Sequence, residues 1–346
     1  MKNRNIHSLL QEHGTLFLPD IGTFFNHDIS VALDLVDQLV DSGIPVIKAE
    51  ILHDANICLK SDLSEFYYSA SKDLMIEENY RQVIERKIVP LAAYEKIFSH
   101  IKNKGCEFVV SVYDNKGAEF AVSQGAIALK IASSNITHQP LIEYVASLGE
   151  TILLDTGHSS LEEVARAVNW ANDAGAFDII IQHSPLAPPV PVDKHNLRFM
   201  LTLGQSFNLP YGLSDHHISE EMLYAATALG AAVVEKGVCP DALGDEQDRA
   251  HALNVSEAVL VQERISNIAK GLGTGVRHLE RHRDKYRSRM GLIAKTDIIE
   301  GEVLSDENIG YAFPATGLAV EHVEFALGRK SNKFIPAGQP ISATDF

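Results

Sequence analysis

Residues 151–183 read TILLDTGHSSLEEVARAVNWANDAGAFDIIIQH, and this stretch holds one full copy of the unit that decides the fold. It begins with the apolar run TILLD (151–155) and ends with the apolar run FDIIIQH (177–183). Between them, LEEVARAVNWANDAG (161–175) spaces its apolar residues by three and four, which is typical of a helix that buries one face. Two apolar strands joined by such a helix indicate a parallel sheet covered by helices.

The same unit recurs along most of the chain. Strands are expected at 15–21, 45–51, 107–113, 126–133, 151–155, 177–183, 210–215 and 231–237. Eight such units close a (β/α)₈ barrel, although the pattern also allows an open doubly wound sheet. No G-x-G-x-x-G follows the first strand, and polar residues cluster at the carboxyl ends of many strands. Both observations favour the barrel.

Two segments depart from the repeat. Residues 52–88 are longer than most connections between a strand and its helix, and we interpret them as a lid or insertion over the active face or as a longer second helix. The repeat ends before the basic run RHLERHRDKYRSR (277–289), which favours a solvated helix between domains. We therefore expect a barrel domain over 1–275, a linker over 276–287 and a small β-rich domain over 288–346.

Composition excludes several classes of partner. The chain has 46 acidic and 30 basic residues, a formal net charge of −16, so neither nucleic acid nor an anionic membrane is an expected partner. Cys58, Cys106 and Cys239 are too few and too widely spaced for a disulfide framework or a zinc site, which indicates a reducing compartment. We find no signal peptide and no apolar run of membrane-spanning length. A cytoplasmic protein is expected.

Six blocks form an ordered set along the chain. They are LPDIGTFFNHD (18–28), IALKIASSNITHQPLIEYVASLG (127–149), LLDTGHSSLEEVARAV (153–168), YGLSDHHIS (211–219), ALGAAVVEKG (228–237) and RSRMGLIAKTDIIEGEVLSDENI (287–309). In this order and spacing the first five resemble the sialic acid (N-acetylneuraminate) synthase family, and the last resembles its C-terminal antifreeze-like (SAF) domain. Departures within the blocks make the chain similar to divergent members such as the spore-coat polysaccharide biosynthesis protein E group.

The resemblance implies an enzyme of surface-carbohydrate biosynthesis, built as a TIM barrel followed by a β-clip domain. The family condenses phosphoenolpyruvate with an N-acetylated amino sugar, such as N-acetylmannosamine, to give a nonulosonic acid. The implied cofactor is a divalent metal, manganese or magnesium. The implied assembly is a domain-swapped homodimer, in which the small domain of one chain covers the barrel mouth of the other.

Two lysines match the positive charge that such a reaction needs. Phosphoenolpyruvate carries a carboxylate and a phosphate, so its site needs cations and directed donors. Lys48 and Lys130 lie in apolar strands, where a buried ammonium group needs an anionic partner, and the family has lysines at both positions. The catalytic residues that the resemblance implies are Asp20, Lys48, Lys130 and Glu235. The implied phosphate- and substrate-binding residues are Glu50, Ser111, Lys130, Ser133, Ser214 and Asp248.

The block GLSDHHIS (212–219) matches the family at its metal ligand, His216, with Asp215 as an orienting group. The family's second ligand follows its Glu-Lys pair, but here that position is Gly237. One imidazole alone holds a divalent cation poorly. His217 and His183 are the additional candidates. An alternative metal site would combine Asp155, His158, His183, His216 and His217.

Other departures change the charge and polarity of the expected site. Asp155 stands where the family has a serine near phosphate, and a carboxylate there repels phosphate unless it is protonated or bound to a cation. Glu50 replaces a glutamine, and Phe313 of the small domain replaces an arginine. Phe24 and Phe25 replace an Asn-His pair, which makes that part of the mouth more apolar.

Three functions follow from these observations. The favoured one is a phosphoenolpyruvate-dependent transferase that forms a C–C bond. The first alternative is a non-catalytic or altered-substrate sugar-binding paralogue with a degenerate phosphate and metal site, which Asp155, Gly237 and Phe313 favour. The second is an aldolase with Lys130 as a Schiff-base nucleophile, which would leave the tail domain without a role.

Overall fold

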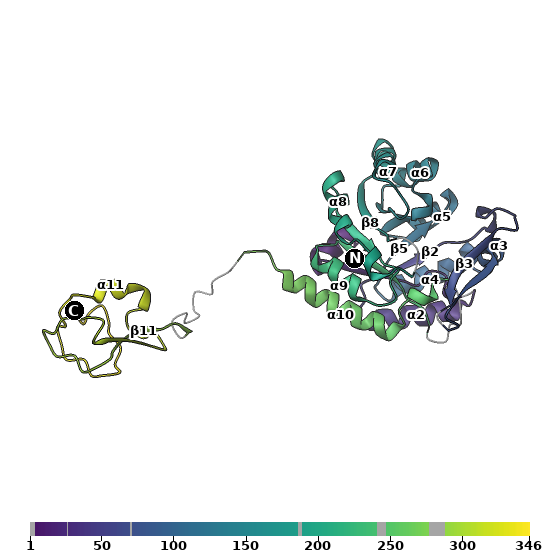
Figure 1. Cartoon of the computed structure of the whole chain (residues 1–346). Coiled ribbons are helices and arrows are strands. Elements are labelled where there is room, and N and C mark those ends of the chain that lie inside the picture. The colour runs from purple at the N-terminus through teal and green to yellow at the C-terminus, as the bar shows by residue number, and fades with distance from the viewer. Residues whose placement is uncertain (1–3, 26, 70, 186–188, 241–246, 277–287) are drawn as a thin grey trace. The chain divides into compact units, whose positions relative to one another are not determined.

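The computed structural model of this chain describes residues 4–25, 27–69, 71–185, 189–240, 247–276 and 288–346. The chain divides into two compact units, Met1–Thr274 and Gly275–Phe346 (Figure 1). Most of the predicted linker over 276–287 lies outside the described residues, so the exact domain boundaries stay predictions.

Eight parallel strands close into a barrel in the first unit, and this closure decides against an open sheet. Each strand lies within the range that the sequence predicts for it. In order around the barrel they are β1 (Leu16–Asp20), β10 (Val233–Gly237), β9 (Tyr211–Ser214), β8 (Asp178–His183), β7 (Thr151–Asp155), β6 (Ala128–Ile131), β5 (Glu107–Val112) and β2 (Val46–Glu50).

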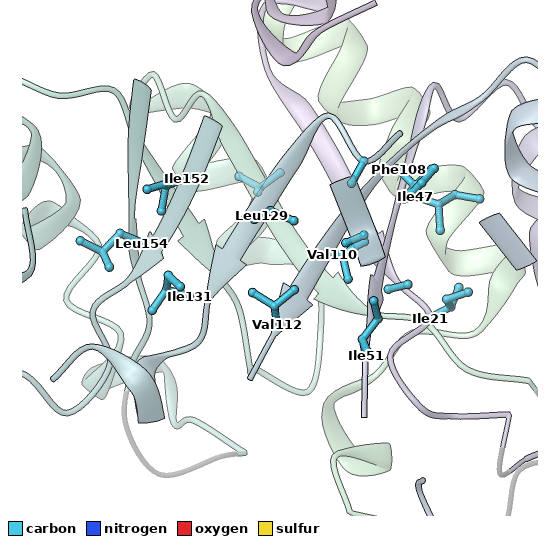
Figure 2. Close-up of a cluster of buried hydrophobic side chains, with 14 of the residues drawn as sticks. Ile21, Ile47, Ile51, Phe108, Val110, Val112, Leu129, Ile131, Ile152 and Leu154 are labelled. Atoms are coloured by element: carbon cyan, nitrogen blue, oxygen red, sulfur yellow. The ribbon is translucent and has the colours of Figure 1, made fainter. Parts of the chain in front are cut away.

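Helices cover the outside of the barrel. They are α2 (Ile29–Asp41), α4 (Leu91–Asn103), α5 (Asn115–Ser123), α6 (Gln139–Ser147), α7 (Leu161–Asp173), α8 (Arg198–Phe207), α9 (Glu221–Ala228) and α10 (Val255–Leu272). Local sequence fixes where they begin: Ser160 and Glu163 form a capping box at the start of α7. Figure 2 shows part of the buried layer between strands and helices, including Leu129 of β6 and Ile152 of β7.

The barrel interior changes from apolar to polar or charged along the strands, because side chains on a strand alternate between inside and outside. The inner residues at the amino ends of the strands, such as Val46 and Val233, form a buried apolar cluster with Ile6 and Leu9. The latter two belong to α1 (Ile6–His13), which therefore closes this end of the barrel. Two residues further along, the same strand faces carry charge: Lys48 follows Val46, Lys130 follows Ala128 and Glu235 follows Val233.

Residues 52–88 form an insertion, and the alternative of a longer second helix is wrong. The segment contains a short 3-10 turn (Ala55–Ile57), an antiparallel hairpin of β3 (Ser64–Ser69) and β4 (Leu74–Asn79), and the short helix α3 (Tyr80–Glu85). The aromatic run EFYY (65–68) favours a strand over a helix. Arg81 donates hydrogen bonds to the carbonyl oxygens of Ala55 and Cys58, at 2.6 and 2.7 Å, and so fastens α3 to the turn.

The second unit is small and has a core of its own. β11 (Gly291–Ala294) pairs antiparallel with β12 (Ile309–Ala312), and a short helix, α11 (Val323–Ala326), follows. Its buried side chains are Leu292, Ala294, Ile298, Leu304, Ile309, Ala326, Ile335 and Ile341. Among the described residues of both units, no helix combines the length and the apolar character needed to cross a bilayer.

Candidate active site

A cavity of about 610 Å³ lies at the carboxyl ends of the barrel strands. The insertion contributes to its wall through Tyr80, Ile84 and Lys87. The sequence-predicted residues that line it are Asp20, Lys48, Glu50, Ser111, Lys130, Ser133, Ser214, His216, Glu235 and Asp248. The structure thus brings the predicted set into one place, while the role of each residue remains a prediction.

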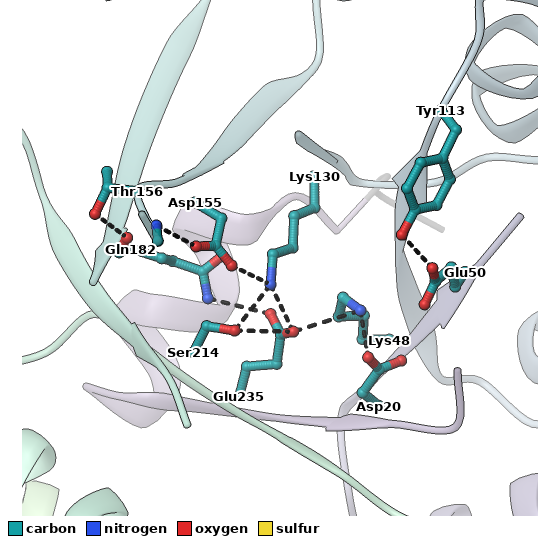
Figure 3. Close-up of polar contacts among 11 residues, drawn as sticks. Asp20, Lys48, Glu50, Tyr113, Lys130, Asp155, Thr156, Gln182, Ser214 and Glu235 are labelled. Carbon is teal, nitrogen blue, oxygen red and sulfur yellow. Dashed lines mark hydrogen bonds and ion pairs between the residues drawn. The ribbon is translucent and has the colours of Figure 1, made fainter. Parts of the chain in front are cut away.

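Glu235 lies at the centre of a buried ion-pair cluster in this cavity (Figure 3). Its Oε1 lies 2.6 Å from the Nζ of Lys130 and 3.4 Å from the Nζ of Lys48. Its Oε2 accepts a hydrogen bond of 3.2 Å from Gln182. Lys48 is also paired with Asp20, from the neighbouring strand β1. A single glutamate therefore positions two buried ammonium groups.

Burial and neighbouring charges separate the titration of these carboxyl groups. Burial raises the pKa of Asp20 to about 6, because the opposing attraction of Lys48 is reduced by repulsion from Glu235 and Glu50. Burial acts against ionisation of Glu235 too, but the ammonium groups of Lys130 and Lys48 lower its pKa to about 2. Glu235 is therefore ionised at neutral pH, whereas Asp20 gains and loses its proton at a pH only slightly below neutral.

Lys48 and Lys130 remain cationic although they are buried. Burial by itself lowers the pKa of each ammonium group, but the adjacent carboxylates outweigh it and raise both pKa values above the ordinary value for lysine. A Schiff-base nucleophile must be an uncharged amine. The raised pKa of Lys130 therefore speaks against the aldolase alternative.

Asp155, the predicted departure near phosphate, is part of the same cluster. Its Oδ2 lies 3.0 Å from the Nζ of Lys130, and its side chain is 5% exposed. Lys130 also donates to the hydroxyl of Ser214 at 3.0 Å. Lys130 thus has two anionic partners, Asp155 and Glu235, before any substrate enters.

Asp215 does not orient His216, and that expectation is wrong. Its carboxylate lies 2.7 Å from the Nζ of Lys236 and accepts from the Nε2 of His195 at 3.2 Å. Burial opposes the charge on Asp215, but His195 and Lys236 lower the pKa of this carboxyl to about 2. Lys236 also donates to the backbone carbonyl of His217, so this buried group fixes the loop after β9.

The additional metal candidates lie elsewhere. The Nδ1 of His217 donates to the carbonyl of Val190, and the Nε2 of His183 donates to the carbonyl of His195, both at 2.7 Å. Neither ring is among the described residues that line the cavity. In the described part of the chain no group of three or more His, Cys, Asp or Glu side chains could hold a metal ion. The alternative site of Asp155, His158, His183, His216 and His217 is therefore not formed there.

The structure instead places His251 beside His216. The two ring centroids are 5.1 Å apart with the planes at 76°, and both residues line the cavity. The Nδ1 of His251 is buried and has no hydrogen-bond partner. An orphaned imidazole nitrogen next to the expected metal ligand is compatible with a bound divalent cation, so the residues present fit the implied cofactor.

The two phenylalanines near the first strand have different surroundings. Phe24 lines the cavity, as expected, whereas Phe25 is 2% exposed and belongs to the core between strands and helices. The expectation that both rings face the mouth is therefore wrong for Phe25. Phe24 also fills the space next to Gly237, because a Cβ at position 237 would lie 3.1 Å from its ring.

Four residues of the site escaped the sequence-based prediction: Gln182, Tyr113, Lys87 and His251. Gln182 could have been found, since it follows Ile180 on the inward face of β8. Tyr113, whose hydroxyl donates to Glu50, lies just past the end of β5. Lys87 and His251 come from irregular segments, where no periodicity indicates the direction of a side chain.

The cavity has more carboxylates than ammonium groups. Among the described lining residues there are four lysines (48, 87, 130 and 236) and six carboxylates (20, 50, 155, 215, 235 and 248), a surplus of two negative charges with the carboxylates ionised. An anionic substrate would therefore need an additional positive charge in this cavity.

Comparison with known proteins identifies the family of this fold and site. The model of the NeuB family matches residues 35–277, and the model of the SAF domain matches residues 289–346. The chain is 28% identical over 323 residues to the N,N'-diacetyllegionaminic acid synthase of Campylobacter jejuni, covering 92% of this chain and 96% of the relative. It is 27% identical over 326 residues to the pseudaminic acid synthase of Helicobacter pylori, covering 93% and 94%.

A solved structure agrees with the fold of the whole chain. The spore coat polysaccharide biosynthesis protein spsE from Bacillus subtilis superposes with a TM-score of 0.62 at 23% identity, covering 96% of this chain and 94% of that one. Together the family model, the barrel and the C-terminal unit assign this chain to the NeuB family, the nonulosonic acid synthases of surface-carbohydrate biosynthesis.

Proposed function

We propose that this chain condenses phosphoenolpyruvate with the aldehyde of an N-acetylated amino sugar to form a nonulosonic acid in the cytoplasm. The observation that supports this most is the pair of buried lysines, Lys48 and Lys130, which Glu235 holds at the carboxyl ends of the strands. Two fixed ammonium groups in one cavity suit a donor that carries both a carboxylate and a phosphate. The synthase names of the two relatives favour this function over a non-catalytic paralogue.

The proposed reaction has three bond changes. C3 of phosphoenolpyruvate bonds to the aldehyde carbon of the open-chain sugar, and the aldehyde oxygen takes a proton to become a hydroxyl. Water adds to the cationic centre left at C2 and gives up a proton. The bond between C2 and the phosphate oxygen then breaks while the C2 hydroxyl passes its proton to the leaving phosphate, which releases inorganic phosphate and the keto acid.

The charges of the site suggest a division of roles. Lys48 and Lys130 hold the anionic donor, and Glu235, with its pKa of about 2, stays ionised beside the positive charge that develops at C2. Asp20, with its pKa of about 6, is the group that accepts the proton from the attacking water. Ser111, Ser133, Ser214, Glu50 and Asp248 line the same cavity and would contact phosphate or sugar.

A divalent cation, manganese or magnesium, would add the positive charge that the cavity lacks. Bound at His216, it would act as a Lewis acid toward the carbonyl oxygen of the sugar. It would also offset the surplus of two carboxylates, so that phosphoenolpyruvate could enter next to Asp155.

The proposal also includes the assembly that the resemblance implies. In a domain-swapped homodimer, the unit Gly275–Phe346 of one chain would cover the barrel mouth of its partner. Phe313, which is 60% exposed in its unit, is then the residue available at the position of the family's arginine.

The test is release of inorganic phosphate from phosphoenolpyruvate. The full chain would be assayed with manganese or magnesium and a panel of acceptors that carry one or two N-acetyl groups. We expect phosphate release with at least one acceptor, and none for Lys130→Ala, whose affinity for phosphoenolpyruvate should fall below detection by calorimetry. Undiminished affinity in Lys130→Ala, or no binding by the native chain with metal present, would contradict the proposal.

A further inference from the structure

His216 and His251 form a pair of imidazoles that the reaction scheme above does not use in full. His216 follows the end of β9, and His251 ends a short 3-10 turn (Arg249–His251) beyond β10. The separation of their ring centroids, 5.1 Å, is that of two rings in contact. Two rings that each place a nitrogen about 2 Å from one shared ion, at a near-tetrahedral angle, also have centroids roughly 5 Å apart.

The hydrogen bonds of His251 leave one nitrogen available. Its Nε2 contacts the Oδ1 of Asp248 at 3.3 Å, so the carboxylate favours the tautomer with the proton on Nε2. Its Nδ1 then presents a lone pair, and this atom is buried without a partner. A carboxylate on one ring nitrogen and a free lone pair on the other is the arrangement of a metal-ligating histidine.

The backbone explains how a ligand at position 251 can serve the end of β10. Leu253 donates to the carbonyl of Gly237 at 2.8 Å, and Cys239 donates to the carbonyl of Leu253 at 2.9 Å, so the two segments run side by side. A side chain at position 237 would meet Phe24 at 3.1 Å and Ala252 at 3.3 Å. The space beside β10 is thus tight for a ligand from the strand itself, while the neighbouring segment supplies a ring.

We propose that His216 and the Nδ1 of His251 together bind one divalent cation, with Asp248 as the residue that positions His251. The two imidazoles leave the other coordination positions to water or substrate oxygens, as in a site built for catalysis rather than for structure. This binding site is inferred from the contact of the two rings and the unpaired Nδ1 of His251, whereas the use of the ion in condensation rests on the proposed function.

Charge around the pair favours a cation. Asp155 and Asp248 are near enough to His216 to attract a cation there, and the positive charge of Lys130 opposes them. The cavity as a whole has its surplus of two carboxylates. Because the described residues offer no third protein ligand of the His, Cys, Asp or Glu type at this place, binding should be weaker than in a four-ligand structural site.

The experiment is a metal titration of the chelator-treated full chain without any substrate. Manganese binding would be measured by calorimetry, and cobalt binding by the visible absorption of the bound ion. We expect one ion per chain in the native protein and at least a tenfold weaker Kd in His216→Ala and in His251→Ala. Asp248→Asn should weaken binding by a smaller factor than either of these two variants, as expected for a residue that orients a ligand.

A matched control is His158→Asn. His158 is an exposed histidine in the loop after β7 with a positive φ of 56°, a conformation that asparagine tolerates. Its metal affinity should equal that of the native chain. The melting temperature of each variant, measured in the presence of chelator, shows whether that variant is folded. If His251→Ala is not folded, His251→Gln replaces it.

Two results would overturn the inference: no manganese or cobalt binding by the native chain, or full affinity in a folded His251 variant. If His216→Ala loses affinity for the metal while His251→Ala keeps the native affinity, His251 is likewise excluded as a ligand. Because phosphoenolpyruvate is absent, these results are independent of catalysis. A chain that binds metal through both histidines yet never releases phosphate would refute the proposed function and leave the metal site intact.

Discussion

Asp155 is a residue at which the site departs from the pattern of the family that the chain resembles. Its carboxylate lies 3.0 Å from the Nζ of Lys130, the group that holds the anionic donor in the proposed function. Replacing it by serine should remove a like charge and free one donor of Lys130, so we expect Asp155→Ser to lower the KM for phosphoenolpyruvate by about tenfold. Steady-state phosphate release would measure this, with Asp173→Asn, an exposed acidic residue on α7, as the control. A raised KM would mean that Asp155 aids binding, for example through a bound cation.

Asp20 should set the acid limb of the pH profile. Burial raises its pKa to about 6, so below that pH the base is protonated and kcat/KM should fall tenfold per pH unit. Glu50 is one of the charges that raise the pKa of Asp20, so Glu50→Gln should move the limb to lower pH. Asp20→Asn should lose activity by about 10²–10⁴-fold and lose the limb. If the acid limb of the kcat/KM profile stays near pH 6 in both variants, the limb belongs to a group other than Asp20.

At the scale of secondary-structure elements, α1 acts as the closure of the barrel's amino end. Leu9 is fully buried against the apolar inner residues of the strands. Truncation of a core leucine leaves a cavity and costs about 2–5 kcal/mol, so Leu9→Ala should lower the free energy of unfolding by that amount. Trp170 is the chain's one tryptophan and lies on α7, so its fluorescence in urea reports the barrel unit.

Leu10 supplies the control for this prediction, because it is only partly buried against the same cluster. Leu10→Ala should lower the free energy of unfolding by clearly less than Leu9→Ala does. The kcat/KM of both folded variants should match the native value, since the reactive cavity lies at the other end of the strands. Equal costs for the two variants would mean that α1 is not a seal of the barrel.

Elements also show how far sequence alone could predict this protein. The strands follow from apolar runs, and Lys48 and Lys130 follow from their place near strand ends within such runs together with the family resemblance. The ion pair between Lys48 and Glu235 could not be predicted, because it joins β2 to β10 across β1 and needs the closed barrel. His251 could not be placed either, since its position depends on an irregular segment that only tertiary contacts fix.

For the whole molecule, charge and assembly are linked. The chain has a net charge of −16, and a surplus of two carboxylates in its cavity is part of that charge. An anionic donor therefore approaches against repulsion, unless nearby cations offset it. The resemblance to the family implies an arginine of the small domain at the position that Phe313 holds here. The substrate affinity of the proposed dimer should accordingly depend on the charge at this one position of the partner's small domain.

Substitutions at Phe313 test that dependence. If the small domain covers the partner's barrel mouth, Phe313→Asp should raise the KM for phosphoenolpyruvate by about tenfold and Phe313→Arg should lower it, because the added charge faces a site rich in carboxylates. The control is Phe334→Asp in the same unit, since Phe334 is 55% exposed and Phe313 is 60% exposed. Light scattering would give the mass of each variant in solution. The swapped assembly is supported if the protein is a dimer, the two charge variants differ in their KM for phosphoenolpyruvate, and the control has the KM of the native chain. A monomer in which all three variants share the native KM would show that each barrel works without the small domain of a second chain.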